Sequence, residues 1–391
     1  MQVSRQGLSS GKRPPGYRAL REIGDSTVRD RFKELDGLRG IAALFVVFSH
    51  FTGGYDSKYV ASEPFRFDMY WGAYGVQLFF LISGFVILMS GCTSRRPSDF
   101  VISRAARLYP AYWLALCESI VLSVAFAVPH TDIGWVNRIL NFAMVQRLFL
   151  VPNVDEVYWT LAIEMQFYIL VFVILWITRC RLTDKLLYWI SGIWLLVAFC
   201  IALVFGGYSR GLDPQLVWAP VKMLLNVFVV QWAPFFITGM FAFRARYSSG
   251  PDAGKFWALS CLGGAFAVLM HATLHGWTES VWVLGVVLIF LAVVARRKTR
   301  VLLLGPVQWF GTISYSLYIG HVVLGNLVIH WTVDSVGRPL AMCIAFVVVG
   351  LNAAVLHYTA ETRGSRQTKE LLLCLRARID RRFGIREVGP Q

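Results

Sequence analysis

Apolar residues fill ten long segments of the chain, and shorter polar stretches separate them. The segments are 38–55, 70–91, 103–128, 158–178, 186–206, 219–243, 256–275, 279–295, 307–331 and 338–358. A helix of about 20 apolar residues crosses the hydrocarbon core of a bilayer. The pattern therefore predicts an all-α fold, a polytopic transmembrane helical bundle of about ten spans.

Composition supports a membrane protein. Hydrophobic residues make up 56% of the 391 residues, and the mean hydropathy is +0.56. A soluble domain cannot bury that much apolar surface and still present a wettable exterior. We expect the lipid bilayer itself to be a partner of this protein.

The net charge of +15 could indicate a nucleic-acid partner, but its placement argues against one. Of the 38 Lys and Arg residues, 31 lie in 1–39, 95–107, 179–185, 244–255, 296–300 and 363–386. These segments fall in alternate loops, which is the positive-inside pattern. The pattern predicts that both termini are cytosolic, and that the basic tails lie on anionic lipid.

We expect three regions along the chain. Residues 1–33 are basic and rich in Gly, Pro and Ser, which indicates a flexible cytosolic arm. Residues 34–363 form the transmembrane domain, and 364–391 form a basic cytosolic tail. We expect no metal, because the cysteines show no metal-ligand spacing. The oligomeric state stays open.

Arg39 and His50 lie in one apolar stretch and share a helical face, since eleven residues make about three turns. Ionisable side chains at membrane depth are costly and usually serve a function. His50 is therefore a candidate general base. A histidine that only hydrogen-bonds a neighbouring helix fits the same pattern equally well.

Glu164 comes out at nearly the same predicted membrane depth as His50, counting helical rise from the ends of their spans. A carboxylate beside an imidazole favours the protonated ring, which suits a base that must hold a proton. We therefore predict a catalytic His50–Glu164 pair. His321 is expected at the depth of His50 and on one helical face with Ser314. An imidazole that satisfies a buried hydroxyl is the alternative for His321.

Arg104 and Arg107 are neighbours on one helical face near the cytosolic edge, and Arg39 begins its span at the same level. Three guanidinium groups there would match the phosphates of a nucleotide-type cofactor. Positive-inside topology alone is the alternative. Glu118 and Lys222 are weaker candidates, because no motif surrounds them.

Five motifs follow one another in the chain. They are Leu-Asp-Gly-Leu-Arg-Gly at 35–40, Gly-Val-Gln-Leu-Phe-Phe-Leu-Ile-Ser-Gly-Phe at 75–85, Arg-x-x-Arg-x-x-Pro at 104–110, Tyr-Trp-Thr-Leu-x-x-Glu-x-x-Phe-Tyr at 158–168 and Ser-Tyr-Ser-Leu-Tyr-x-x-His at 314–321. Together they resemble the acyltransferase-3 family of integral-membrane O-acyltransferases, over about residues 33–363.

The resemblance implies an enzyme that moves an acyl group, usually acetyl from cytosolic acetyl-CoA or another acyl-CoA, to a hydroxyl of a carbohydrate or lipid-linked glycan. It makes His50 the base, Arg39 its partner, and Arg104 and Arg107 donor-binding residues. The likeness to the family's closing segment is incomplete, because Thr362 stands where proline is common, so no role is assigned to Glu361. It also implies a standalone protein of the bacterial inner membrane.

The remaining candidates complete the predicted site. We assign Ser314 and Tyr315 to the donor with the three arginines, and His321, Tyr318 and Trp159 to the acceptor. Ser314, Tyr315 or His321 could donate to the oxyanion. The rival hypothesis is a proton-coupled transporter or flippase of a glycan or lipid precursor, in which His50 and Glu164 relay protons.

Overall fold

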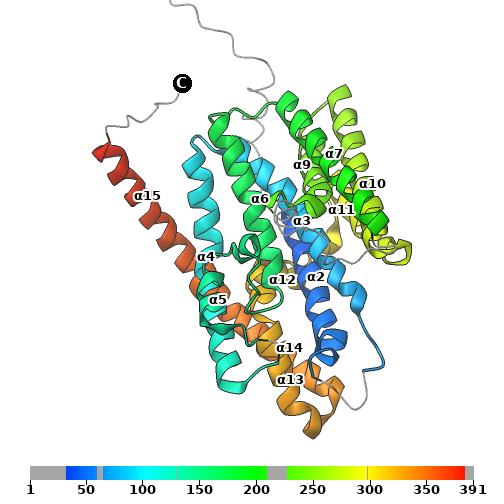
Figure 1. Ribbon diagram of the computed structural model, residues 1–391, viewed down its shortest axis with the longest axis vertical. Helices are drawn as coiled ribbons and strands as arrows, with labels where there is room; N and C mark the ends of the chain where they lie inside the picture. The colour runs from blue at the N-terminus through cyan, green and yellow to red at the C-terminus, as the bar shows by residue number, and fades with distance from the viewer. Residues whose placement is uncertain (1–31, 60–64, 130, 209–226, 297, 384–391) are drawn as a thin grey trace, which may run out of the picture.

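The computed structural model describes residues 32–59, 65–129, 131–208, 227–296 and 298–383, and this part of the chain is helical without strands (Figure 1). The α-helices are α2 (Lys33–Ser49), α3 (Gly75–Thr93), α4 (Pro97–Phe126), α5 (Gly134–Asn141), α6 (Tyr158–Ile177), α7 (Asp184–Tyr208), α9 (Ala233–Tyr247), α10 (Pro251–His275), α11 (Trp277–Ala295), α12 (Gly305–Gly320), α13 (Val322–Val336), α14 (Arg338–Leu356) and α15 (Ser365–Arg382). The predicted all-α class is confirmed.

Short helices of other types join these elements. Two π-helical segments, η1 (His50–Gly54) and η7 (His357–Gly364), continue α2 and α14. The 3₁₀ segments are η2 (Tyr70–Tyr74), η3 (Gln146–Phe149), η5 (Val230–Trp232) and η6 (Arg300–Leu303). π-Helical turns are rare and often lie at functional sites.

The number of spans is close to the predicted ten. In the described residues, seven helices are long and apolar enough to cross a membrane, and α12 with α13 makes an eighth if the bent pair is one span. The predicted span 186–206 coincides with α7. The predicted span 219–243 starts outside the described residues, and its described part is η5 and α9. The expected arm, residues 1–33, also lies almost wholly outside them.

The helices that carry the motifs approach one another closely because glycines face glycines or backbone. A Cβ added to Gly40 of α2 would lie 2.5 Å from the Gly311 nitrogen of α12. A Cβ on Gly84 of α3 would lie 2.1 Å from the Phe236 carbonyl oxygen of α9. The small residues of 75–85 therefore serve close helix packing, as their spacing indicates.

This packing makes a stability prediction. Gly84→Leu is expected to destabilise the fold by about 1–3 kcal/mol, because the side chain has only backbone to displace. The measurement is the thermal unfolding midpoint of the detergent-solubilised protein. Gly192→Leu is the matched control, since nothing lies within 4 Å of a Cβ there. Equal midpoints for both variants would contradict the packing.

Both histidines lie where a helix departs from regular α-helical geometry. His50 begins the π-helical segment that follows α2, and His321 occupies the break between α12 and α13, where the axis bends by 76°. Both breaks interrupt regular helical hydrogen bonding, so backbone groups there accept bonds from side chains.

The helices α14, η7 and α15 run on as one 45-residue helical segment, and α15 lies along the outside of the bundle beside α4 (Figure 1). Arg96 pairs with Asp380 at 2.7 Å, and Arg376 pairs with Asp99. These contacts lie where α3 and α6 end and where α4 and α7 begin, which we call the basic end. The expected tail thus contains an ordered helix within 364–391.

Candidate functional site

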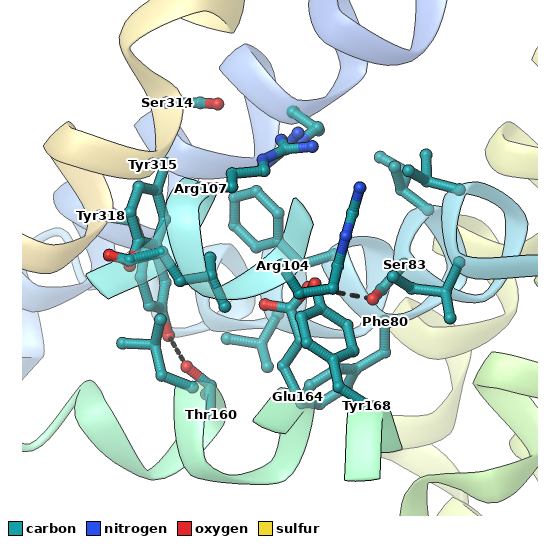
Figure 2. A pocket seen from close by; sticks show the side chains of 18 residues that line it. Phe80, Ser83, Arg104, Arg107, Thr160, Glu164, Tyr168, Ser314, Tyr315 and Tyr318 are labelled. Atoms are coloured by element: carbon teal, nitrogen blue, oxygen red, sulfur yellow. Dashed lines mark hydrogen bonds between the residues drawn. The ribbon is translucent and has the colours of Figure 1, made fainter. Parts of the chain in front are cut away.

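A polar pocket lies between α2, α3, α4, α6 and α12, and we call it the arginine pocket (Figure 2). Most of the predicted donor and catalytic residues meet in it. They are Arg39, Arg104, Arg107, Glu164, Ser314 and Tyr315, and Tyr318, which was assigned to the acceptor, lines this pocket as well. Apolar side chains such as Phe79, Phe80 and Val76 form the rest of the wall.

The charges in this pocket are mostly positive. Arg39 interacts electrostatically with Arg107, a like charge, and with Glu164. The buried Nε of Arg104 has no hydrogen-bond partner, and its guanidinium lies 6.0 Å from the ring centre of Tyr168. Among the described residues, none of the three arginines forms an ion pair within 4.0 Å. Three guanidinium groups against one carboxylate leave an excess of positive charge, which favours an anionic ligand.

Glu164 is the acidic group of the pocket, and it is already engaged. Its Oε1 accepts hydrogen bonds from Ser83 Oγ, 3.0 Å away, and from the Tyr168 hydroxyl. Figure 2 shows Ser83 of α3 beside Glu164 of α6. No hydrogen bond or ion pair joins Glu164 to His50 in the described residues, so the predicted pair is not formed in this conformation.

The pocket is narrow in this conformation. Its volume is about 60 Å³, room for only a few water molecules. An acyl-CoA is far larger, so a donor could enter only if the walls move apart. The aromatic side chains of α12 hold those walls together, since Tyr315 donates to the Leu108 carbonyl at 3.0 Å and Tyr318 bonds Thr160 at 2.8 Å (Figure 2).

Ser314 is turned toward its own helix. Its hydroxyl donates to the Gly311 carbonyl oxygen at 2.8 Å, although the residue lines the pocket. Tyr318 is placed differently. Its ring lines the arginine pocket, while its carbonyl oxygen lies 2.8 Å from Nδ1 of His321. Tyr318 thus connects the pocket to the histidines.

His50 and His321 contact each other directly. The His321 Nε2 atom lies 3.1 Å from His50 Nδ1, and the ring centres are 5.0 Å apart. The prediction that both histidines lie at one depth is confirmed. His321 is fully buried, whereas the His50 side chain is 20% exposed, so His50 is the ring that a substrate can reach.

The hydrogen bonds assign different tasks to the ring nitrogens. His321 Nδ1 must donate to the Tyr318 carbonyl, which leaves His321 Nε2 as an acceptor. His50 Nδ1 lies 2.9 Å from the Val46 carbonyl oxygen and 3.1 Å from His321 Nε2. Both of these atoms are acceptors, so His50 Nδ1 carries a proton. His50 Nε2 is then the nitrogen that gains and loses a proton.

Glu156 is the carboxylate that faces His50. Its Oε1 lies 3.3 Å from His50 Nε2, and its Oε2 lies 3.0 Å from Lys58 Nζ. The Glu156 side chain is 39% exposed, so it has room to turn. A carboxylate held by Lys58 can stabilise an imidazolium at His50 and release it when the ring is neutral.

A second cavity, which we call the outer cavity, is lined by Glu156, the carboxylate that faces His50. Its volume is about 370 Å³, and Lys58, Asp155, Glu156, Trp159 and Asn326 are among its lining residues. Asn326 is 1% exposed, and its Oδ1 has no hydrogen-bond partner. A buried amide oxygen without a partner at a cavity wall indicates that a ligand or water donates to it.

Asp155 holds the two helices that meet at this cavity. Its carboxylate accepts from the backbone N–H of Val157, before α6, and of Val323, in the first turn of α13. Burial raises the pKa of Asp155 to about 6, although Lys58 and these N–H groups act in the opposite direction. Asp155 caps the helix that begins next to His321, and so helps to fix that ring.

Several functional candidates could not be found from the sequence. Lys58 and Glu156 lie in loops, where a charged residue is ordinary, and Asn326 is a single buried amide in α13 with no motif around it. The one available signal was a pair of acids, Asp155 and Glu156, directly before the motif at 158–168. Trp159 lines the outer cavity, and its ring packs at a tilt against Trp232, with ring centres 5.3 Å apart.

Glu118 and Glu361 are not among the lining residues of either cavity. Glu118 accepts two hydrogen bonds from Asn352, at 2.9 and 3.0 Å, which satisfies its charge locally. Glu361 accepts from Ser316 and lies 2.9 Å from His357. Lys222 lies outside the described residues. Among those that are described, no group of three His, Cys, Asp or Glu is placed to hold a metal ion.

The family model described as an acyltransferase domain matches residues 32–357, which is most of the chain. The chain belongs to this acyltransferase family. The matched region includes every motif that the sequence shares with the family, as well as both cavities. Membership of an acyltransferase family disfavours the rival transporter or flippase, since such proteins make no covalent bond.

Three curated proteins with named roles are similar to this acyltransferase. The exopolysaccharide production protein ExoZ of Rhizobium meliloti is 28% identical over 64% of this chain and 75% of its own length. The peptidoglycan O-acetyltransferase OatA of Listeria monocytogenes is 23% identical over 81% of this chain and 53% of its own. The putative membrane-bound transacylase BcsY of Komagataeibacter xylinus is 25% identical over 86% and 84%.

Some matches span only part of the relative. The matched region covers 53% of OatA and 65% of protein 2 in the picA locus of Rhizobium radiobacter, which is 34% identical over 32% of this chain. No solved structure matches the chain.

Proposed function

We propose that this membrane protein transfers an acyl group, acetyl in the simplest case, from cytosolic acyl-CoA to a hydroxyl of a cell-surface or exported polysaccharide, with His50 as the general base. One observation carries the proposal. The His50–His321 pair joins the arginine pocket, through Tyr318, to the outer cavity, through Glu156. The names of ExoZ and OatA support a polysaccharide acceptor.

The donor binds from the basic end. The phosphates of CoA contact Arg39, Arg104 and Arg107, because guanidinium forks match phosphate oxygens. The thioester then reaches past Tyr318 toward His50. The walls of the arginine pocket must separate to admit it, and the hydrogen bonds of Tyr315 and Tyr318 are the contacts that open.

The acceptor enters through the outer cavity. Trp159 offers an aromatic face to a sugar ring, and Asn326 offers an amide oxygen to a hydroxyl. The acceptor hydroxyl donates to His50 Nε2 in the place that Glu156 now faces, while Glu156 remains bound to Lys58.

The chemical step balances without a metal or redox group. His50 Nε2 takes the hydroxyl proton as the acceptor oxygen attacks the thioester carbonyl, which forms a tetrahedral oxyanion. The C–S bond then breaks, the His50 imidazolium gives its proton to the departing sulfur so that CoA leaves as the thiol, and the ester remains on the sugar. Glu156 stabilises the imidazolium of His50 between these events.

Two carboxamide variants separate the roles of the two glutamates. Glu156→Gln is expected to lower kcat about ten- to a hundredfold with little change in donor KM, because the amide cannot stabilise the imidazolium. Glu164→Gln is expected to alter donor KM, because it lies among the arginines and not beside His50. The measurement is steady-state kinetics with acetyl-CoA. A change in donor KM for Glu156→Gln together with a loss of kcat alone for Glu164→Gln would contradict the assignment of the two glutamates to separate sites.

Slow hydrolysis of the donor tests the proposed activity without knowledge of the acceptor. Purified protein should release free CoA from acetyl-CoA, detected with a thiol reagent, faster than His50→Ala protein does. A transporter or flippase would release none.

A further inference from the structure

An apolar groove runs between α6 and α7, with α3 and α9 behind it. Its volume is about 470 Å³, and its lining includes Leu170, Ile174, Leu187, Ile190 and Met240. No described residue in the lining is charged. The indole Nε1 of Trp194, which also faces the groove, donates to the Phe228 carbonyl at 2.8 Å and so offers no free polar group. Such a groove fits a hydrocarbon chain.

The turn between α6 and α7 forms the mouth of this groove at the basic end. Leu182 and Thr183 of the turn belong to the lining, and Arg179, Arg181 and Lys185 flank them. All three basic side chains are exposed, and none forms an ion pair with a described residue. Nearby basic residues are neutralised instead, since Arg244 pairs with Asp184 at 2.8 Å.

We propose that this groove is a binding site for one anionic glycerophospholipid. An acyl chain lies along the apolar wall, and the phosphate lies among Arg179, Arg181 and Lys185. Basic pockets between helices at the cytosolic surface favour anionic headgroups, and each nearby cation adds to the attraction. A zwitterionic lipid also carries a phosphate, but its headgroup cation offsets that charge and repels the three basic side chains, so charge complementarity selects the anionic lipid.

The site abuts the arginine pocket. Ile87 of α3 belongs to the lining of both the groove and the pocket. A chain packed against Ile87 from the groove side therefore supports one wall of the pocket. The proposal does not depend on the acyl-transfer function, because it rests on the groove and the basic turn alone.

The test is native mass spectrometry of the detergent-purified protein, titrated with phosphatidylglycerol and with phosphatidylcholine of identical chains. The parent is expected to bind one phosphatidylglycerol with clear preference over phosphatidylcholine. Replacing Arg179, Arg181 and Lys185 by alanine should lower that affinity by roughly fivefold for each cation removed. Alanine at Arg296, Lys298 and Arg300, exposed cations away from the groove, is the matched control and should change little.

A second pair of variants tests the groove itself. Val197 lines the groove and is 41% exposed, so Val197→Trp adds bulk without disturbing the core. This variant should lose the bound lipid, whereas Val281→Trp on the exposed surface of α11 should retain it. Equal binding of both lipids by the parent, equal losses in the two alanine triples, or full retention in Val197→Trp would each overturn the proposal.

Discussion

His50→Ala protein is expected to lose about 10²–10⁴ in the rate of acyl transfer while it still inserts and accumulates. In the described His50–His321 pair, the other three ring nitrogens are each held in a hydrogen bond as donor or acceptor. His50 Nε2 is therefore the ring nitrogen that can take a proton from the sugar hydroxyl. The measurement is the initial rate of acetyl transfer at saturating acetyl-CoA, normalised to the amount of folded protein.

His330→Ala is the matched control for this variant. His330 is exposed and stacks on Tyr59 at 4.6 Å, away from both cavities, so its removal should leave the rate near that of the parent. A well-expressed His50→Ala protein with the parent rate would remove His50 from the mechanism.

Arg107→Ala is expected to weaken binding of CoA about ten- to a hundredfold, because a charge-assisted hydrogen bond to phosphate contributes roughly that factor. Arg104→Ala should act alike, since both guanidinium groups lie in the arginine pocket without an ionic partner among the described residues. Arg107→Lys should rescue only in part, because a point charge cannot reproduce the planar fork. Calorimetric titration of CoA against the purified proteins measures the effect.

Arg296→Ala provides the control for general electrostatic attraction. Arg296 is exposed at the end of α11 and lies outside the pocket lining, so its loss should leave CoA binding unchanged. If Arg104→Ala, Arg107→Ala and the control all bind CoA as the parent does, the paired arginines are topology signals only, and the donor must bind elsewhere.

Much of the fold could be predicted from the sequence, because the length of an apolar segment directly measures a membrane crossing. The eight spans seen in the described residues follow the predicted segments, with α12 and α13 as one bent pair. The 76° bend at His321 could not be predicted. Gly320 precedes it, but a glycine at a helix end predicts neither an angle nor a direction.

Side chains that share a helix face reach one pocket as expected, whereas the comparison of depths between helices anticipated the contact of His50 with His321 but not the acid that faces His50. Arg104 and Arg107 lie three positions apart on α4 and reach one pocket with Arg39. Glu164 needed a comparison between α2 and α6, and His50 lies in the π-helical segment η1, where a straight α-helical count no longer holds. The acid that faces His50 is Glu156, in the loop before α6.

Transfer of radiolabel from acetyl-CoA into alkali-labile ester on cell-surface polysaccharide is the direct test of acyl transfer through His50. Membranes with the parent protein, given labelled acetyl-CoA on the cytosolic side, should place label on the polysaccharide, and membranes with His50→Ala should place at least a hundredfold less, within the range expected for a general base. His330→Ala membranes should match the parent. Equal labelling in parent and His50→Ala membranes, or no labelling with any protein, would contradict acyl-CoA-dependent transfer through His50.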